Sequence, residues 1–280
     1  MIRIVLLGII QGLTEFLPVS SSGHLLLFEK LFWNGAAQSS GWLNLLLHGG
    51  TLVAVCILYR KTLWGLFVAA AKGIASLFVA LFGKNKRAVR ECASRYHGEY
   101  AKIGLLAVAS VPAAVVGIFA EDWVERTLGN GKVLWLCFMV TAILLLVSDR
   151  TRGQGKIGFW TAVGMGIGQA FAVLPGLSRS GTTIAMALIL GAGREESTEF
   201  SFLMSIPVIL GGIVFALPQA AGGDTGVGVA VVGMVAAAVF GIVALKAVQK
   251  LTLGKKNYLF AIYLLVLSAV CAILSAYNIL

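Results

Sequence analysis

The chain has 280 residues, of which 59% are hydrophobic and 12% charged, whereas soluble domains carry about 25% charged residues. This composition excludes a soluble globular protein and indicates one polytopic, all-α membrane domain over residues 1–280, because the apolar runs are continuous and of helical length. The net charge of +10 does not indicate a nucleic-acid partner, since the basic residues lie between the apolar runs. The four cysteines show no metal-ligand spacing, and we expect small core residues at Cys56, Cys92, Cys137 and Cys271.

The first apolar stretch, residues 4–33, contains polar groups that a lipid-facing helix would not tolerate. These groups are Gln11, Glu15, the serines at 20–22 and His24, and Pro18 interrupts the stretch in its middle. Irregular backbone at membrane depth is tolerated where it is buried in protein or lines a wet cavity. We therefore expect a re-entrant helical hairpin whose broken tip lies inside the protein.

Six further runs have the roughly 17–25 apolar residues that a membrane-spanning helix needs. They lie at residues 43–59, 101–119, 132–148, 198–218, 227–245 and 257–277. Residues 62–82 are also long enough to span. Basic residues flank this segment on both sides, however, and Lys72 lies midway along it, so we predict an in-plane or re-entrant helix there.

Residues 157–192 are a second stretch that Pro, Gly and Ser break in the middle, and we expect a second re-entrant hairpin. The two stretches resemble each other, because a serine cluster begins nine residues after Gln11 and again nine residues after Gln169. Three predicted spans follow each hairpin. We predict an inverted-topology repeat, with copies at about 1–148 and 157–280 and a shared site near the membrane midplane.

Charge then predicts the orientation of the spans. The connecting segments 84–102, 149–156 and 246–256 are rich in Lys and Arg, and the positive-inside rule makes them cytoplasmic. The segments between them, 120–131 and 219–226, contain acidic residues, and we place them outside. The first hairpin then enters from outside and the second from inside.

The first broken stretch combines groups suited to proton transfer and to nucleophilic attack. Gln11 and Glu15 are four residues apart and therefore share one helical face. A carboxylate at membrane depth is costly and indicates a functional site. His24 is the natural proton donor or acceptor, and the serines at 20–22 permit covalent attack with His24 as base. Direct attack by water is equally compatible with these residues.

The second broken stretch, LPGLSRSGTT, supplies Arg179 and several hydroxyl groups. Arg179 needs a counter-charge, which could be Glu15 across the repeat interface or an anionic ligand. Its planar guanidinium suits bidentate binding of phosphate, and the following helix N-terminus adds positive potential. A serine-rich packing loop with Arg179 paired to Glu15 is the structural alternative.

Together the two loops predict a site for a phosphate-bearing substrate that is reached from the membrane. The anion-binding loop would lie opposite the loop that carries the nucleophile and the acid or base. Glu15 and Gln11 also offer oxygen ligands for a divalent cation, which would share the phosphate groups of the substrate.

At these residues the chain resembles the undecaprenyl-diphosphate phosphatases of the bacitracin-resistance type. That family has an (E/Q)xxxE segment running into LPVSS(S/T)GH, matched here by QGLTEFLPVSSSGH. Its second signature, PGxSRSxxT, is matched by PGLSRSGTT at Pro175 to Thr183. Further similarity in LNLLLHGGTLVAV at 43–55 and EFSFLMSIPVILGG at 199–212 extends the resemblance over nearly the whole chain.

The resemblance implies removal of the terminal phosphate from undecaprenyl diphosphate, which gives undecaprenyl phosphate for reuse as the carrier lipid of peptidoglycan and other cell-wall polymers. It also implies a multi-pass protein of the bacterial cytoplasmic (inner) membrane, a requirement for a divalent cation such as Mg²⁺ or Ca²⁺, and a homodimer. The active site is expected to open to the extracytoplasmic side.

The resemblance also implies a role for each matched residue. Glu15 becomes a catalytic or metal-associated carboxylate, Ser21 a nucleophile or phosphate ligand, His24 the acid or base and Arg179 the phosphate binder. Substrate-binding positions follow at Gln11, Ser20, Ser22, Ser178, Ser180 and Thr183. The family has Glu or Gln at the first motif position, and Gln11 removes one charge from a metal site that would use two carboxylates there. The basic stretch 62–102 is an elaboration for which no catalytic role is expected.

Two readings compete with the phosphatase. Inverted repeats with broken helices are also the architecture of transporters, so the chain could move a polyprenyl phosphate across the bilayer. The Ser, His and Glu set of the first hairpin favours the enzyme, because an anion carrier needs no nucleophile and base. A non-catalytic membrane scaffold would leave an intramembrane Arg and Glu on matched loops unexplained.

Overall fold

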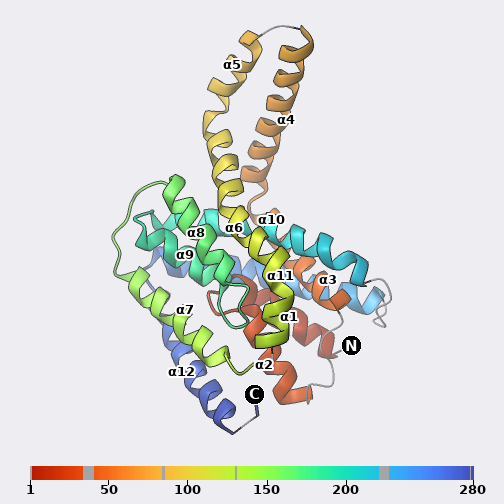
Figure 1. Cartoon of the computed structure of the whole chain (residues 1–280), viewed down its shortest axis with the longest axis vertical. Helices are drawn as coiled ribbons and strands as arrows, with labels where there is room; N and C mark the ends of the chain where they lie inside the picture. Colours follow the sequence, from red (N-terminus) through yellow and green to blue (C-terminus); the bar gives the residue numbers. More distant parts are fainter. Residues whose placement is uncertain (1, 34–40, 84–85, 130, 221–226, 278) are drawn as a thin grey trace.

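The computed structural model describes residues 2–33, 41–83, 86–129, 131–220, 227–277 and 279–280, and within these ranges the protein is α-helical (Figure 1). The helices are α1 (Ile2–Phe16), α2 (Ser21–Trp33), α3 (Gly41–Leu58), α4 (Arg60–Gly83), α5 (Lys86–Arg95), α6 (His97–Leu128), α7 (Leu134–Asp149), α8 (Phe159–Phe171), α9 (Arg179–Ile189), α10 (Arg194–Ala220), α11 (Val227–Leu253) and α12 (Asn257–Ala276). One isolated parallel β-bridge joins Gly155 to Ala192. The all-helical prediction is therefore confirmed for the described part of the chain.

Both stretches that were expected to break in the middle do so. In the first, helix α1 ends at Phe16, just before Pro18, and α2 begins at Ser21. In the second, α8 ends at Phe171 and α9 begins at Arg179. Proline lacks the amide hydrogen that a helix interior needs and restricts the residue before it, which explains why each helix stops near its proline.

Five helices of the described residues are long and apolar enough to cross a membrane. Four of them contain predicted spans: α6, α10, α11 and α12. The other two predicted spans are also helices, but their apolar parts are shorter, Leu45–Leu58 in α3 and Leu134–Asp149 in α7. A span of about 20 residues is usual, so these two helices are short for a bilayer.

The fifth helix is α4, which the sequence predicted to lie in the plane or to re-enter. Its stretch Arg60–Leu81 has the length and the mean hydropathy of a membrane span. Apart from Arg60 and Lys61 at its start, Lys72 is the one charged residue in this stretch. With α5 and the beginning of α6, α4 projects from the rest of the molecule as a helical hairpin (Figure 1). The Tyr100 hydroxyl donates to the carbonyl oxygen of Ala69 at 2.9 Å and ties the two arms together.

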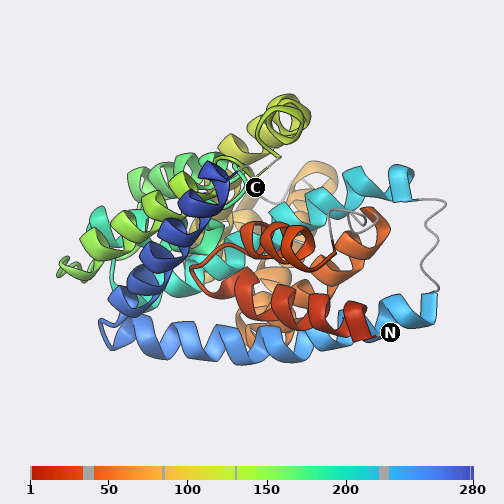
Figure 2. The same ribbon diagram turned by 90° about the horizontal axis from the view of Figure 1, so that it is seen from below.

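The first hairpin is anchored by close packing of α1 on α11, which run side by side (Figure 2). A Cβ atom added at Gly12 would lie 2.5 Å from the carbonyl oxygen of Ala237, so this approach requires glycine. One turn further along α1, Phe16 is fully buried and meets the ring of Phe202 edge to face, with centroids 5.6 Å apart. These contacts fix the end of α1, where Glu15 lies.

The cysteines divide between core and surface. Cys137 and Cys271 are buried and Cys92 is half-buried, whereas Cys56 is exposed. The expectation of core cysteines is confirmed for Cys137 and Cys271 and wrong for Cys56.

Candidate active site between the two broken hairpins

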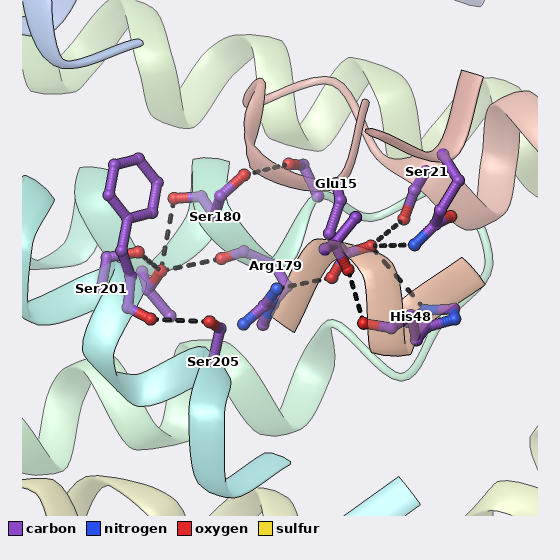
Figure 3. Close-up of polar contacts among 12 residues, drawn as sticks. Glu15, Ser21, His48, Arg179, Ser180, Ser201 and Ser205 are labelled. Atoms are coloured by element: carbon purple, nitrogen blue, oxygen red, sulfur yellow. Dashed lines mark hydrogen bonds and ion pairs between the residues drawn. The ribbon is translucent and has the colours of Figure 1, made fainter. Parts of the chain in front are cut away.

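Glu15 and Arg179 form an ion pair across the two broken hairpins. The Arg179 guanidinium donates to Glu15 Oε1 at 2.6 Å, and the two side chains are 15% and 7% exposed (Figure 3). Of the two counter-charges that the sequence allowed for Arg179, the structure contains Glu15. The residues that meet are 164 positions apart, so the fold rather than local sequence brings them together.

The second oxygen of the Glu15 carboxylate, Oε2, is contacted by three further side chains (Figure 3). The Ser21 hydroxyl donates to it at 2.6 Å, and the Gln11 amide donates to it at 2.9 Å. His48 Nε2 lies 3.8 Å from the same oxygen. One carboxylate thus joins both hairpins and helix α3, and it is the group within hydrogen-bonding distance of the candidate nucleophile Ser21.

His48 was missed by the sequence reasoning. It lies in the predicted span 43–59, which was taken as a plain membrane helix although it contains an ionisable residue. The general expectation that an ionisable group within a span marks a functional site would have found it. Its side chain is 36% exposed, so the imidazole lies beside Glu15 and is partly accessible.

Three hydroxyls of the second loop, those of Ser178, Ser180 and Thr183, are buried and bonded to protein. Ser178 caps α9, its hydroxyl accepting from the Gly181 amide at 3.1 Å. Ser180 donates to the carbonyl oxygen of Leu17 in the first loop at 3.2 Å. The hydroxyls of Thr183 and Ser201 lie 2.6 Å apart. These groups therefore hold the two loops and α10 together, and they present Arg179 to the site.

Helix α10 contributes two serines that the sequence reasoning did not name. Figure 3 shows Ser201 and Ser205 on the side of Arg179 away from Glu15. Ser205 is 1% exposed and donates to the carbonyl oxygen of Phe202 at 2.6 Å. Serine and threonine are common in the interior of membrane proteins, so their spacing on a predicted span gave no distinct signal.

Three candidates of the first loop lie apart from the Glu15 carboxylate. The hydroxyls of Ser20 and Ser22 are 3.3 Å from each other, and Ser22 is exposed. The two ring nitrogens of His24 contact other groups, namely the carbonyl oxygen of Ser20 at 2.7 Å and the hydroxyl of Tyr263 at 2.6 Å. The structure therefore joins Ser21 to Glu15 and joins His24 to helix α12.

The donor set beside Glu15 fits a divalent cation. Gln11 Oε1 is fully buried and has no hydrogen-bond partner among the residues that the structure describes. This acceptor and the Glu15 carboxylate are hard oxygen ligands of the kind that Mg²⁺ and Ca²⁺ prefer. A single carboxylate and an amide leave most of the coordination sphere to water and to substrate phosphate, as is usual for Mg²⁺.

Comparison with known proteins gives a consistent answer. The sequence matches the family described as bacitracin resistance protein BacA over residues 4–270. It is 39% identical over 272 residues to an undecaprenyl-diphosphatase of Desulfosudis oleivorans, covering 95% of each chain. It is also 36% identical over 268 residues to that of Thermosipho melanesiensis, and 31% identical over 259 residues to that of Korarchaeum cryptofilum. The Thermosipho alignment covers 94% of this chain and 95% of the relative, and the Korarchaeum alignment covers 92% and 93%. The chain therefore belongs to the BacA family.

Proposed function

We propose that the protein is an integral membrane phosphatase that hydrolyses undecaprenyl diphosphate to undecaprenyl phosphate and inorganic phosphate. The observation that carries the proposal is the meeting of Glu15, Arg179 and Ser21 within 2.6 Å contacts at the joint between two broken hairpins. An anion binder, a carboxylate and a hydroxyl nucleophile are the groups that removal of a phosphate requires. The relatives that carry the name undecaprenyl-diphosphatase cover nearly the whole chain.

Arg179 binds the terminal phosphate in this proposal. Its guanidinium presents several donors in a fixed plane, which match phosphate oxygens in a bidentate contact. In the structure Glu15 engages one of these donors at 2.6 Å. The incoming phosphate therefore shares or replaces that contact, and the carboxylate is released to act on the nucleophile.

A divalent cation would be held by Glu15 and by the buried Oε1 of Gln11. When bound, it supplies positive charge that offsets the negative charge of the diphosphate and of the leaving phosphate. Without such charge, Glu15 and the diphosphate repel each other. Mg²⁺ or Ca²⁺ is therefore expected to raise the rate, and chelation to lower it.

Ser21 and Glu15 support nucleophilic attack. The Ser21 oxygen forms a bond to the terminal phosphorus, its proton passes to Glu15, and the bond from phosphorus to the bridging oxygen breaks. Undecaprenyl phosphate leaves with the bridging oxygen, and Glu15 gives up its proton to that oxygen. A water molecule then attacks the phosphoserine, Glu15 takes a proton from the water, and the bond from phosphorus to the Ser21 oxygen breaks. Glu15 returns the proton to the Ser21 oxygen, and inorganic phosphate leaves. In the alternative, water attacks the phosphorus directly and Ser21 acts as a phosphate ligand. A phosphorylated Ser21 trapped by acid quenching would decide for the covalent route.

We further propose that both hairpins re-enter the membrane, as inverted copies, and that the site opens to the outside of the cytoplasmic membrane. The support is the clustering of basic residues in 84–102, 149–156 and 246–256, which the positive-inside rule makes cytoplasmic. Single cysteines placed in these segments, in a variant lacking the four native cysteines, should react with an impermeant reagent only after the membrane is opened. Labelling of intact cells at 84–102 would overturn this orientation.

Phosphate release from undecaprenyl diphosphate by the purified protein in detergent tests the activity. We expect release by the wild type in Mg²⁺ or Ca²⁺, and loss of release with Arg179→Ala and Glu15→Ala. Lys72→Ala is the matched control, because Lys72 is an exposed charge on α4, outside the contacts of the site. An inactive wild type, tested with and without each cation, would contradict the enzyme.

A further inference from the structure

Both ring nitrogens of His24 are engaged by protein groups, and their partners define the tautomer. Nδ1 lies 2.7 Å from the carbonyl oxygen of Ser20, and a carbonyl oxygen accepts hydrogen bonds without donating. Nδ1 therefore carries the hydrogen. In the neutral ring Nε2 is then the acceptor, and the Tyr263 hydroxyl, 2.6 Å away, donates to it. The basic nitrogen of His24 faces helix α12 and not the Glu15 carboxylate.

The imidazole is also held by two aromatic rings. The ring of Tyr263 stacks on it, with centroids 5.7 Å apart and an interplanar angle of 16°. The ring of Phe138 on α7 meets it edge to face, also at 5.7 Å. Helices α7 and α12 pack along each other, and Phe138 and Leu264 belong to the same buried cluster. Helices α7 and α12 thus hold the His24 ring through Phe138 and Tyr263.

His24 connects these two aromatic rings to Ser20, where the backbone of the first loop is most constrained. Ser20 has a left-handed backbone, with φ of 73°, which is rare and strained for a residue with a side chain. Its carbonyl oxygen accepts from His24 Nδ1. A Cβ atom at Gly23 would lie 2.7 Å from the Phe138 ring, so the loop has no room to shift on this side. The residue after Ser20 is Ser21, whose hydroxyl donates to Glu15.

We propose that Tyr263 is a positioning residue for the reaction, acting through His24 on the backbone that places Ser21. The Ser20 carbonyl sets the Nδ1–H tautomer of His24, and the Tyr263 hydroxyl holds the orientation of the ring by donating to Nε2. His24 Nδ1 then holds the left-handed turn at Ser20. Without the Tyr263 hydroxyl, Nε2 loses its donor, and the ring is free to rotate and to release the Ser20 carbonyl. The proposal rests on the proposed function only in naming Ser21 as a reacting or phosphate-binding group.

The kinetic test compares two tyrosines of helix α12. Tyr263→Phe removes one hydroxyl and keeps the stacked ring, while Tyr258→Phe makes the same change at a residue of similar exposure, 42% against 46%. For Tyr263→Phe we expect kcat to fall roughly fivefold to tenfold, the effect of one hydrogen bond, with KM nearly unchanged. Tyr258→Phe should match the wild type. Equal rates for Tyr263→Phe and the wild type would overturn the proposal.

A double-mutant cycle distinguishes action through His24 from a general loss of packing. In a His24→Ala background, Tyr263→Phe should have no further effect on kcat, because the coupled partner is already absent. If Tyr263→Phe lowers kcat by the same factor in both backgrounds, Tyr263 acts independently of His24 and the proposal is wrong.

Nuclear magnetic resonance of the histidine rings gives a readout that needs no activity. The chain has three histidines, so ¹⁵N-histidine labelling with His48→Gln and His97→Gln assigns every ring. His24 should show the Nδ1–H tautomer with a hydrogen-bonded Nε2 in the wild type. In Tyr263→Phe the Nε2 signal should move, because its donor is lost, and the Nδ1–H signal should broaden as the ring leaves Ser20. An unchanged His24 ring signal in Tyr263→Phe would overturn the proposal. An inactive wild type with the expected ring signals would overturn the proposed function while the link between Tyr263, His24 and Ser20 is retained.

Discussion

The two broken loops are built from similar sequences but have different structures. When Gln11 is aligned with Gln169, the acid Glu15 matches Val173, and Ser21 matches Arg179. In the second loop Ser178, Ser180 and Thr183 are each at most 3% exposed and bonded to protein. In the first loop Ser21 is half-buried and Ser22 is exposed.

This difference indicates a division of roles between the two loops. The second loop holds the Arg179 guanidinium among buried, hydrogen-bonded hydroxyls, and the first loop carries the Glu15 carboxylate and the Ser21 hydroxyl. Neither loop alone contains all three groups. Removing a hydroxyl from the first loop should therefore lower activity, whereas removing one from the second loop should mainly lower stability.

The largest effect is expected where the loops meet. Arg179→Gln should lower kcat/KM by about 10³-fold or more and lower stability by about 3–5 kcal/mol, because it leaves the buried Glu15 carboxylate without its partner. Adding Glu15→Gln should recover most of the stability and none of the activity. Thermal unfolding in detergent and phosphate release measure the two effects. A double variant as unstable as Arg179→Gln alone would show that the ion pair does not join the loops.

The second effect concerns Ser21, the proposed nucleophile of the first loop. Ser21→Ala should lower kcat by about 10²-fold or more, because the covalent route loses its attacking oxygen, while the melting temperature changes little at this half-buried position. Ser76→Ala, which removes a hydroxyl from a half-buried position on α4, is the control and should stay near wild-type activity. A Ser21→Ala variant that keeps most of its activity would eliminate attack through that residue and favour direct attack by water.

A smaller effect is expected for His48. Its Nε2 lies 3.8 Å from Glu15 Oε2, beyond a hydrogen bond, so His48→Gln removes a weak electrostatic contact. We expect kcat/KM to fall roughly tenfold or less, the scale of a partly solvated charge interaction. His97→Gln, at the start of α6 and exposed, should have no effect. Wild-type kinetics for His48→Gln would remove His48 from the site.

The smallest effect on catalysis should come from the hydroxyls of the second loop. Thr183→Val keeps the shape of the side chain and removes its contact with Ser201, so it should lower stability by about 1–2 kcal/mol and change kcat only a few-fold. Ser180→Ala should behave likewise through its bond to Leu17. Thermal unfolding and initial rates check this pair. A loss of activity as large as that of Ser21→Ala would contradict the division of roles.

Much of this architecture could be predicted from the sequence, because the free-energy cost of burying a polar or helix-breaking residue depends on the type of that residue. Pro18 and Pro175 in apolar stretches predicted two broken helices, and the structure contains them. A buried Arg179 demanded a counter-charge, and Glu15 was a candidate that the structure contains. Both arguments rest on what each residue type tolerates at membrane depth, which needs no knowledge of its neighbours.

The features that could not be predicted depend on how helices are rotated about their own axes. His48 and Tyr263 lie in apolar runs, and nothing in those runs says which face meets the site. The contact between Tyr263 and His24 joins residues that are 239 positions apart. Likewise, α4 was taken as in-plane from its flanking charges, whereas its length and hydropathy also suit a span. Side-chain partners between helices are set by tertiary packing, which periodicity alone does not encode.

The ion pair between Glu15 and Arg179 has a consequence for turnover. In the proposed mechanism, a phosphate that binds Arg179 competes with the Glu15 carboxylate, which lies 2.6 Å from the guanidinium. This competition weakens ground-state binding of the diphosphate and of the released phosphate alike, so the enzyme is expected to resist product inhibition. The tethered carboxylate would then return to Arg179 as the product departs and reset the site for the next lipid.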